Sequence, residues 1–128
     1  HDVLFYVPFE LIGINVTLVE VRHPPLEDSA GVILTDGRSK IVITGDTAKD
    51  IPEKSLELMS QPDLLIADAI IPAIGTVPKH MNADEAMELA SKLQAKKVVL
   101  THLSHLFPPH EQSIKDLPLG YDGMEFEF

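Results

Sequence analysis

The pattern of apolar segments changes at Asp46, and this change constrains the fold more than any other feature of the chain. Before Asp46, short stretches rich in Val, Ile, Leu and Thr follow one another, and Asp36-Gly37 between two of them predicts an antiparallel hairpin. After Asp46, apolar stretches alternate with segments whose apolar residues recur every three or four positions, which is typical of helices. The predicted strands are residues 3–7, 14–22, 31–35, 40–44, 63–67, 98–101 and 124–128.

The predicted helices lie in the second part of the chain, at residues 53–59, after Asn82, and around residues 111–117. Asn82 and the glutamate three residues later have the spacing of a capping box, which marks a helix start. Residues 98–101 are apolar on both faces, as expected for a strand buried in a parallel sheet. We therefore expect one continuous α/β unit over residues 1–128, with a mixed sheet.

Composition excludes several classes of protein. Ten Lys and Arg against twenty Asp and Glu give a formal charge of −10, which argues against tight non-specific binding of nucleic acid. The absence of cysteine excludes disulfides, thiolate zinc sites and a cysteine nucleophile. The chain shows no signal peptide and no apolar run near the roughly 18 residues of a spanning helix. The expected location is cytoplasmic.

Three polar residues follow the ends of apolar strands. Asp46 follows the strand at residues 40–44, Asp68 the strand at 63–67, and His102 the strand at 98–101. In open α/β sheets, side chains at the carboxyl ends of strands converge on a ligand-binding crevice. A carboxylate and an imidazole brought together there would suit a divalent cation.

Each of these residues also has a purely structural explanation. Asp46 could cap a turn after Gly45, and a single histidine after a strand is more often a hydrogen-bonded structural residue than a ligand. However, His23, His80 and His102 all fall at strand or loop ends, and the chain places no histidine in an apolar helix stripe. This grouping favours a metal centre.

Several motifs, in this order, resemble the metallo-β-lactamase fold. They are Gly45-Asp46-Thr47, then His80 ahead of a helix, the run Leu-Thr-His-Leu-Ser-His at residues 100–105, and Tyr-Asp-Gly-Met at residues 121–124. Residues 21–31 resemble the third metal motif of that family. The branch that these motifs resemble contains the ribonuclease Z type tRNA 3′-processing enzymes and the cyclic phosphodiesterases of phosphonate metabolism.

The resemblance implies a site with two divalent metal ions. Asp46 would bridge the two ions, while His23 and His102 would each bind one of them. Zinc is the first choice for histidine and carboxylate ligands, and manganese or iron are the alternatives. The implied activity is phosphodiester hydrolysis by a metal-activated water.

The same resemblance assigns residues to the substrate. His80 would face the scissile phosphate as a proton donor or charge stabiliser, so His80 and Asp46 are the expected catalytic residues. Ser104 and His105 would contact the substrate. Lys79, next to His80, is the basic residue expected to meet a substrate phosphate, unless it is simply a solvated surface lysine.

The His-x-His-x-Asp-His signature of that family is absent from the chain. The resemblance therefore implies only the C-terminal half of a four-layer αββα sandwich, with helices on one face of the sheet. Two protein ligands per ion are fewer than the three of catalytic zinc sites, so these residues alone should bind metal weakly and catalyse little. The remaining ligands would come from an N-terminal half, a second chain or a second copy.

Two other functions are consistent with parts of the sequence. The first is a non-catalytic binding module that retains the fold without a complete metal site. The second is a receiver-like phosphoacceptor domain, suggested by aspartates at strand ends, but it explains neither the histidines nor the hairpins. A metal-dependent hydrolase acting on a small phosphodiester explains more of the residues than either.

Overall fold

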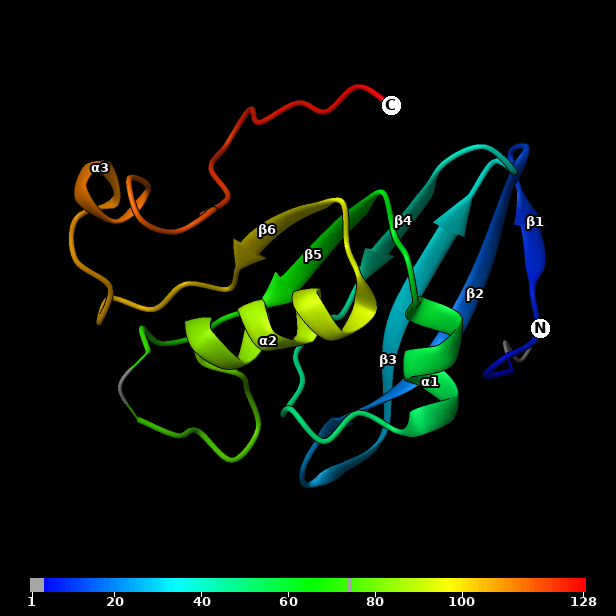
Figure 1. Ribbon diagram of the computed structural model, residues 1–128. Helices are drawn as coiled ribbons and strands as arrows, with labels where there is room; N and C mark the ends of the chain where they lie inside the picture. The colour runs from blue at the N-terminus through cyan, green and yellow to red at the C-terminus, as the bar shows by residue number, and fades with distance from the viewer. Residues whose placement is uncertain (1–3, 74) are drawn as a thin grey trace.

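The computed structural model describes residues 4–73 and 75–128, which form a six-stranded mixed sheet with helices (Figure 1). The strands lie side by side in the order of the sequence. Strands β1 to β4 pair antiparallel, whereas β4, β5 and β6 pair parallel. The strands are β1 (Phe9–Leu11), β2 (Ile14–His23), β3 (Leu26–Thr35), β4 (Lys40–Ile43), β5 (Leu64–Asp68) and β6 (Lys97–Thr101).

Two tight turns set the register of the antiparallel part. Ile12 and Gly13 connect β1 to β2 with φ angles of 51° and 78°, the left-handed conformation that two-residue hairpin loops require. In the β3–β4 turn, Oδ1 of Asp36 accepts the backbone N–H groups of Arg38 and Ser39. The same bonds hold the pKa of the Asp36 carboxyl below its usual value. The predicted antiparallel hairpin at Asp36 is confirmed.

The predicted strand at residues 3–7 is wrong over its described part, and Val3 lies outside the described residues. Tyr6 lies in a turn with φ 66°. Its backbone N–H donates to the carbonyl of Leu18, and its hydroxyl donates to the Glu20 carboxylate. The apolar run is therefore fixed by backbone and side-chain hydrogen bonds of Tyr6 with β2, and the edge strand β1 begins two residues after the run ends.

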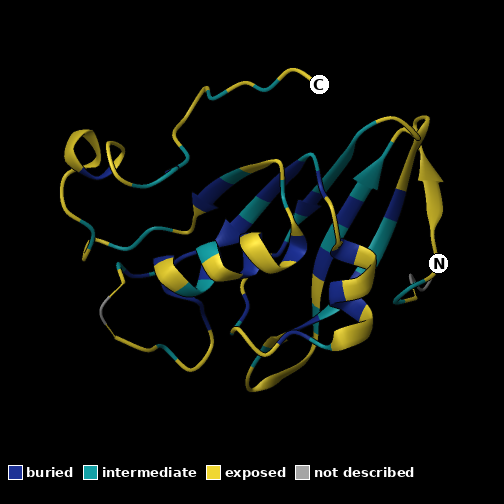
Figure 2. Ribbon diagram, in the orientation of Figure 1, coloured by how far each residue is buried: buried dark blue, intermediate teal, exposed yellow. Residues whose placement is uncertain are grey.

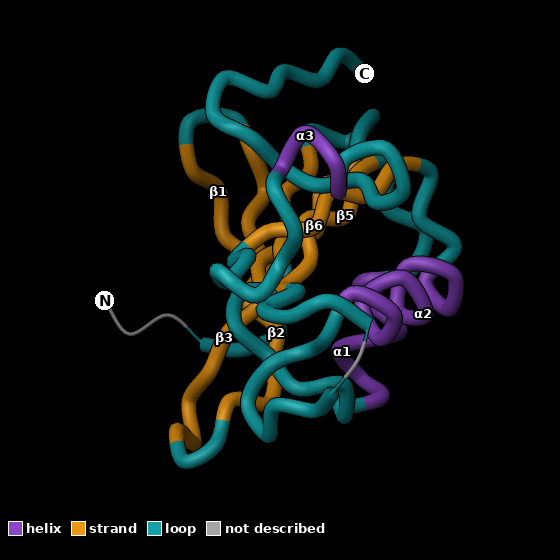
Figure 3. Tube along the Cα trace, turned by 90° about the vertical axis from the view of Figure 1, so that its left-hand side faces the viewer, coloured by secondary structure: helices purple, strands orange, loops and turns teal. Residues whose placement is uncertain are grey.

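Helix α1 (Glu53–Met59) has the predicted bounds, and α2 (Ala83–Leu93) begins at the predicted capping box. The Asn82 side chain accepts the backbone N–H of Glu85, and the Glu85 carboxylate accepts that of Asn82. Both helices lie on the same face of the sheet (Figure 3). In the described part of the chain, no helix combines the length and apolar character that crossing a membrane requires.

The hydrophobic core fills the space between this face and the two helices. Alternate residues of the central strands are buried there, as the pleat of a sheet requires (Figure 2). Met59 of α1 and Leu93 of α2 are at most 2% exposed and pack against them. The buried strand residues of this cluster are Val19, Val21, Ile33, Val42, Leu65, Ala67 and Leu100.

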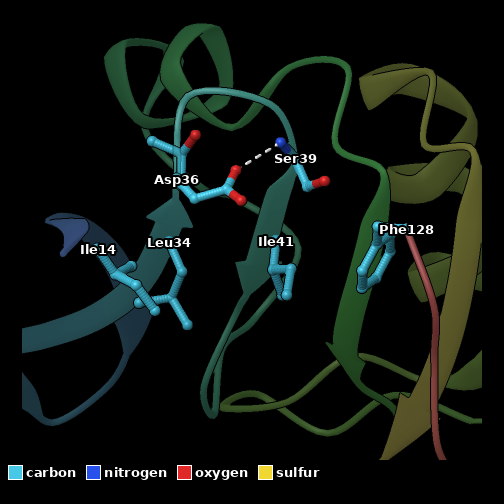
Figure 4. Close-up of a pocket in the computed structure, with 7 residues that line it drawn as sticks. Ile14, Leu34, Asp36, Ser39, Ile41 and Phe128 are labelled. Carbon is cyan, nitrogen blue, oxygen red and sulfur yellow. Dashed lines mark hydrogen bonds between the residues drawn. The ribbon is translucent and has the colours of Figure 1, made fainter. Parts of the chain in front are cut away.

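The opposite face of the sheet is also apolar, but it is only half-buried. At one end of this face Ile14, Leu34 and Ile41 line a cavity of about 320 Å³ together with Phe128 (Figure 4). A sheet buried on one face normally carries polar residues on the other. The half-buried apolar residues of this face are Leu18, Val32, Leu34, Ile41, Ile43 and Ile66.

The C-terminal segment departs from the prediction. Helix α3 (His110–Ser113) is shorter than the predicted helix at residues 111–117, and the predicted strand at residues 124–128 is not formed. Leu119 forms a single parallel bridge with Leu100 of β6. Beyond this bridge residues 124–128 form no strand: Lys97 Nζ of β6 donates to the Glu127 carbonyl at 3.3 Å, and Phe128 lines the cavity on the half-buried face of the sheet.

Candidate metal centre

The parallel part of the sheet brings three predicted residues to one edge. Asp68 is the last residue of β5, His102 directly follows β6, and Asp46 follows β4 after Thr44 and Gly45. Because these strands are parallel and in register, their carboxyl ends meet at the same edge. The convergence predicted from the strand ends is therefore present in the structure.

Two further histidines reach this edge by different routes. His23 ends β2, which is antiparallel to β3 and so runs in the same direction as β4. His80 comes from the loop that precedes α2 and is 9% exposed. The His80 ring contacts the rings of both His23 and His102. Its centroid lies 4.9 Å from that of His23 and 4.8 Å from that of His102.

Asp46 presents one carboxylate oxygen to each of two histidines. Oδ1 lies 3.0 Å from Nδ1 of His102, and Oδ2 lies 4.0 Å from Nε2 of His23. The Asp46 side chain is 53% exposed, so its oxygens remain open to solvent. A carboxylate placed between two imidazoles in this way can bridge two metal ions.

Asp68 is the buried anchor of the cluster, with only 1% of its surface exposed. Its Oδ2 lies 2.8 Å from Nδ1 of His80 and accepts the backbone N–H of Thr47 at 3.0 Å. Its Oδ1 lies 3.2 Å from Nδ1 of His102. Buried carboxylates need such partners, because an unpaired charge in the interior is costly. Asp68 therefore fixes the orientation of two histidines and of the loop that carries Asp46.

Thr47 ties this loop to the end of β2. Its backbone N–H donates to Asp68, and its hydroxyl accepts the backbone N–H of Arg22 at 3.0 Å. The carbonyl of Arg22 in turn accepts the N–H of Ala48. These bonds place the loop after β4 beside His23. The sequence pattern at Gly45-Asp46-Thr47 indicated a turn or a ligand, and the structure shows a bend at Asp46 with its carboxylate facing two histidines.

His102 has a left-handed backbone, with φ 60°. Side chains rarely adopt this conformation, although histidine does so more often than most. Such strained residues concentrate at functional sites, where surrounding contacts hold them in place. Here the contacts with Asp46 and Asp68 orient the His102 ring.

Gly45 is required by the same local geometry. Its φ is +63°, and a Cβ at this position would lie 2.9 Å from the carbonyl oxygen of Ala30. We expect Gly45→Ala to lower the free energy of unfolding by about 1–3 kcal/mol, because it adds backbone strain and a clash with a rigid carbonyl. Urea unfolding measures this loss. Gly37→Ala is the matched control, since Gly37 has φ +87° but nothing within 4 Å of the added Cβ. Equal losses in both variants would show that the clash is unimportant.

The cluster fits a divalent cation. Asp46, Asp68, His80 and His102 each offer a ligand atom, and these atoms all lie within 4.8 Å of one another. The cluster contains two carboxylates, and oxygen and nitrogen donors of this kind suit zinc, manganese or iron. Asp68 is already occupied by three hydrogen-bonding neighbours, so it is better suited to orient ligands than to bind metal. His23 lies outside this group of four, 4.0 Å from Asp46.

The residues predicted to contact a substrate neighbour the cluster in sequence, one position before His80 and two and three positions after His102. Lys79 and His105 are exposed. The Ser104 hydroxyl accepts the backbone N–H of Leu106, which makes it part of a turn after β6. Among residues 4–73 and 75–128, none of the three forms a hydrogen bond or ion pair with Asp46, His80 or His102. Sequence reasoning placed Asp68 at a strand end but gave it no role in the site.

A mixed sheet with helices on one face and a carboxylate–histidine cluster at its strand ends defines an α/β domain whose cluster could hold a metal ion. Residues 5–103 match the family described as the Beta-lactamase superfamily domain, and the chain belongs to this family. The predicted family and the predicted fold class are both confirmed.

The chain covers only part of the length of each relative. The chain is 34% identical over 93 residues to ribonuclease Z of Saccharomyces cerevisiae, a match that spans 70% of this chain and 11% of that protein. Among solved structures, a diphosphatase from the PhnP family superposes with a TM-score of 0.82 at 29% identity, over 98% of this chain and 47% of that one. The metallo-beta-lactamase fold protein YhfI from Bacillus subtilis superposes with a TM-score of 0.72 at 27% identity, over 87% of this chain and 45% of that one. The chain thus spans about a tenth of ribonuclease Z and less than half of the two structures.

Proposed function

We propose that this chain supplies the C-terminal half of a metal-dependent hydrolase that cleaves phosphodiesters. The observation that carries this proposal is the position of Asp46, whose two oxygens face His102 and His23 separately. Membership of the family supports a hydrolase. The names of two relatives, ribonuclease Z and diphosphatase, support a reaction at phosphorus.

In the proposed centre Asp46 would be shared by two divalent ions, and His23 and His102 would each hold one of them. The 4.0 Å and 3.0 Å distances from Asp46 to these histidines leave each ring close to a different carboxylate oxygen. When bound, a pair of such ions supplies charge stabilisation for the phosphate and a water whose pKa falls toward about 7. The negative charge of Asp46 reduces the repulsion between the ions.

His80 is proposed as the proton donor to the leaving oxygen. Its Nδ1 is held 2.8 Å from the buried Asp68 carboxylate, which leaves Nε2 available for the substrate. As the bond between phosphorus and the leaving oxygen breaks, its electron pair remains on that oxygen, which takes the proton from His80 Nε2. An imidazole suits this role because it gains and loses protons near neutral pH. Asp68 is then a positioning residue that fixes the ring.

The proposed centre is incomplete within these residues. Asp46 with one histidine gives each ion two protein ligands, whereas catalytic zinc sites usually have three. Within residues 4–73 and 75–128, no layer of helices covers the half-buried apolar face of the sheet. We propose that an N-terminal half of the domain, or a second chain, supplies the remaining ligands and covers this face.

Lys79, Ser104 and His105 are proposed to contact the substrate beyond the scissile bond. All three lie on loops that leave the edge of the sheet where the cluster lies, and Lys79 and His105 are exposed. The formal charge of −10 favours a small phosphodiester over a long RNA. Comparing the turnover of a dinucleotide with that of a structured RNA would distinguish these two substrates.

The proposed function is tested by metal content and turnover. We expect equilibrium dialysis against Zn²⁺ to give up to two bound ions per chain, with micromolar or weaker affinity because the ligand set is incomplete. Hydrolysis of bis(p-nitrophenyl) phosphate should be slow, should require metal, and should stop on addition of a chelator. A protein that binds no zinc at high micromolar concentration would refute the metal centre. Zinc binding without any metal-dependent turnover would instead support a non-catalytic binding module.

A further inference from the structure

A cavity of about 230 Å³ lies directly beside His80. The loop that follows Asp46 lines one side of it with Ala48 and Asp50, and the loop that precedes α2 lines the other with Thr76 and Val77. The His80 ring therefore belongs both to the wall of this cavity and to the metal-binding cluster. A group held in the cavity would lie next to the proposed proton donor.

The walls of the cavity are held in place by specific contacts. Lys49 Nζ lies 3.1 Å from Oε1 of Glu85, so an ion pair connects the loop after Asp46 to the first turn of α2. The Glu85 carboxylate is only 14% exposed and also caps the helix through the N–H of Asn82. The Asn82 side chain donates to the carbonyl of Gly75, which fixes the second loop. These bonds join both loops to one helix end.

The chemistry of the walls favours an uncharged ligand. Lys49 is neutralised by Glu85, and in the described part of the chain Asp50 forms no ion pair. The cavity therefore keeps one negative charge, which repels phosphate or carboxylate groups. Ala48 and Val77 provide apolar contacts, and the Thr76 hydroxyl and Asp50 carboxylate can hydrogen-bond a hydroxyl group. The volume equals that of about eight waters at roughly 30 Å³ each, so the ligand is small.

We propose that this cavity binds the leaving group of the phosphodiester, and that this group is a small, uncharged hydroxyl compound. The inference rests on the proposed function, because it places the leaving oxygen within reach of His80 Nε2. When the bond to phosphorus breaks, the oxygen takes the proton from His80 and departs as a neutral alcohol. Asp50 is the residue that determines specificity, since it excludes leaving groups that carry their own negative charge.

Binding of leaving-group analogues tests the cavity without requiring hydrolysis. We expect 3-(hydroxymethyl)phenol, titrated into metal-free protein, to shift the backbone amide NMR signals of Ala48, Thr76 and Val77. The anionic analogue 3-hydroxybenzoate should need on the order of tenfold higher concentration for the same shifts. Asp50→Lys should reverse this preference. Glu57→Lys is the control, because it makes the same charge change on the exposed surface of α1. Shifts that are absent, or a preference that Asp50→Lys leaves unchanged, would overturn the proposal.

Hydrolysis then separates this inference from the proposed function. The substrates are methyl 4-nitrophenyl phosphate and its analogue with a carboxylate on the leaving nitrophenol, both with zinc-loaded protein. We expect the neutral leaving group to be preferred about tenfold in kcat/KM, and Asp50→Lys to remove that preference. Turnover of both substrates without discrimination would overturn the role of the cavity and leave the hydrolase intact. Binding of the neutral analogue without any turnover would overturn the proposed function and the leaving-group role, leaving only a small-molecule site.

Discussion

Asp46→Ala is expected to abolish zinc binding and hydrolysis together. The variant removes the carboxylate that faces both His102 and His23, so neither ion would keep more than one of the proposed protein ligands. Loss of a group that only orients a ligand costs about 10–100-fold in metal affinity, and loss of a bridging ligand should cost more. Titration calorimetry with Zn²⁺ measures the affinity, and turnover of bis(p-nitrophenyl) phosphate measures the activity.

Two control variants make this test specific. Asp46→Asn keeps the shape of the side chain and removes its charge, so it should also lose most of the affinity for zinc. Asp116→Ala removes an exposed carboxylate outside the cluster and should change neither affinity nor turnover. Urea unfolding should show that Asp46→Ala folds normally, because the side chain is 53% exposed. Unchanged zinc content and turnover in Asp46→Ala would refute the bridging role.

The convergence of Asp46 and His102 could be predicted because it depends on strand direction alone. Apolar runs separated by a helix predict parallel strands, and polar residues at the ends of parallel strands must meet at one edge. The start of α2 was predictable for a similar reason, because the capping box at Asn82 and Glu85 is a local interaction within four residues. Features set by local chemistry or by strand direction are visible in the sequence.

The role of Asp68 could not be predicted in the same way. A carboxylate after a buried strand looks the same in sequence whether it binds a metal or orients a histidine. Its partners are His80, which lies 12 positions away, and His102, which lies 34 positions away. The distance to His80 depends on the path of the loop before α2, which contains prolines and glycine and has no periodic pattern. Only the three-dimensional arrangement shows that one buried carboxylate contacts both rings.

The two wrongly predicted strands failed because forming a strand requires more than an apolar or alternating run of residues. Residues 124–128 alternate Glu and Phe as a strand would, but no described strand pairs with them, and Phe128 lines the cavity on one face of the sheet instead. At the other end, Tyr6 places its hydroxyl on Glu20 and adopts a turn, so the apolar run around it does not extend the sheet. The alternation of polar and apolar residues predicts which face of a sheet each residue would occupy. Whether the segment pairs with a strand depends on the contacts that its residues make elsewhere in the fold.

The buried position of Asp68 predicts the largest effect on stability. Replacing it by alanine leaves the backbone N–H of Thr47 and Nδ1 of His80 without their buried acceptor, whereas His102 keeps its contact with Asp46. Each unpaired buried group costs about 1–3 kcal/mol. We therefore expect Asp68→Ala to lower the free energy of unfolding by about 3 kcal/mol or more, measured by urea unfolding of metal-free protein.

Asp68→Asn separates the structural role of this residue from its positioning role. The amide keeps the size of the side chain and one oxygen acceptor, so it can accept a hydrogen bond from Thr47 or from a histidine, but it cannot serve both rings as the carboxylate does. We expect a smaller loss of stability than in Asp68→Ala, but a zinc affinity lowered about 10–100-fold because His102 is no longer oriented. NMR signals of the His80 and His102 rings should report the altered orientation directly. If Asp68→Asn keeps the zinc affinity and the ring signals of the unmodified protein, Asp68 only stabilises the fold, and the histidines must be positioned by the loops that carry them.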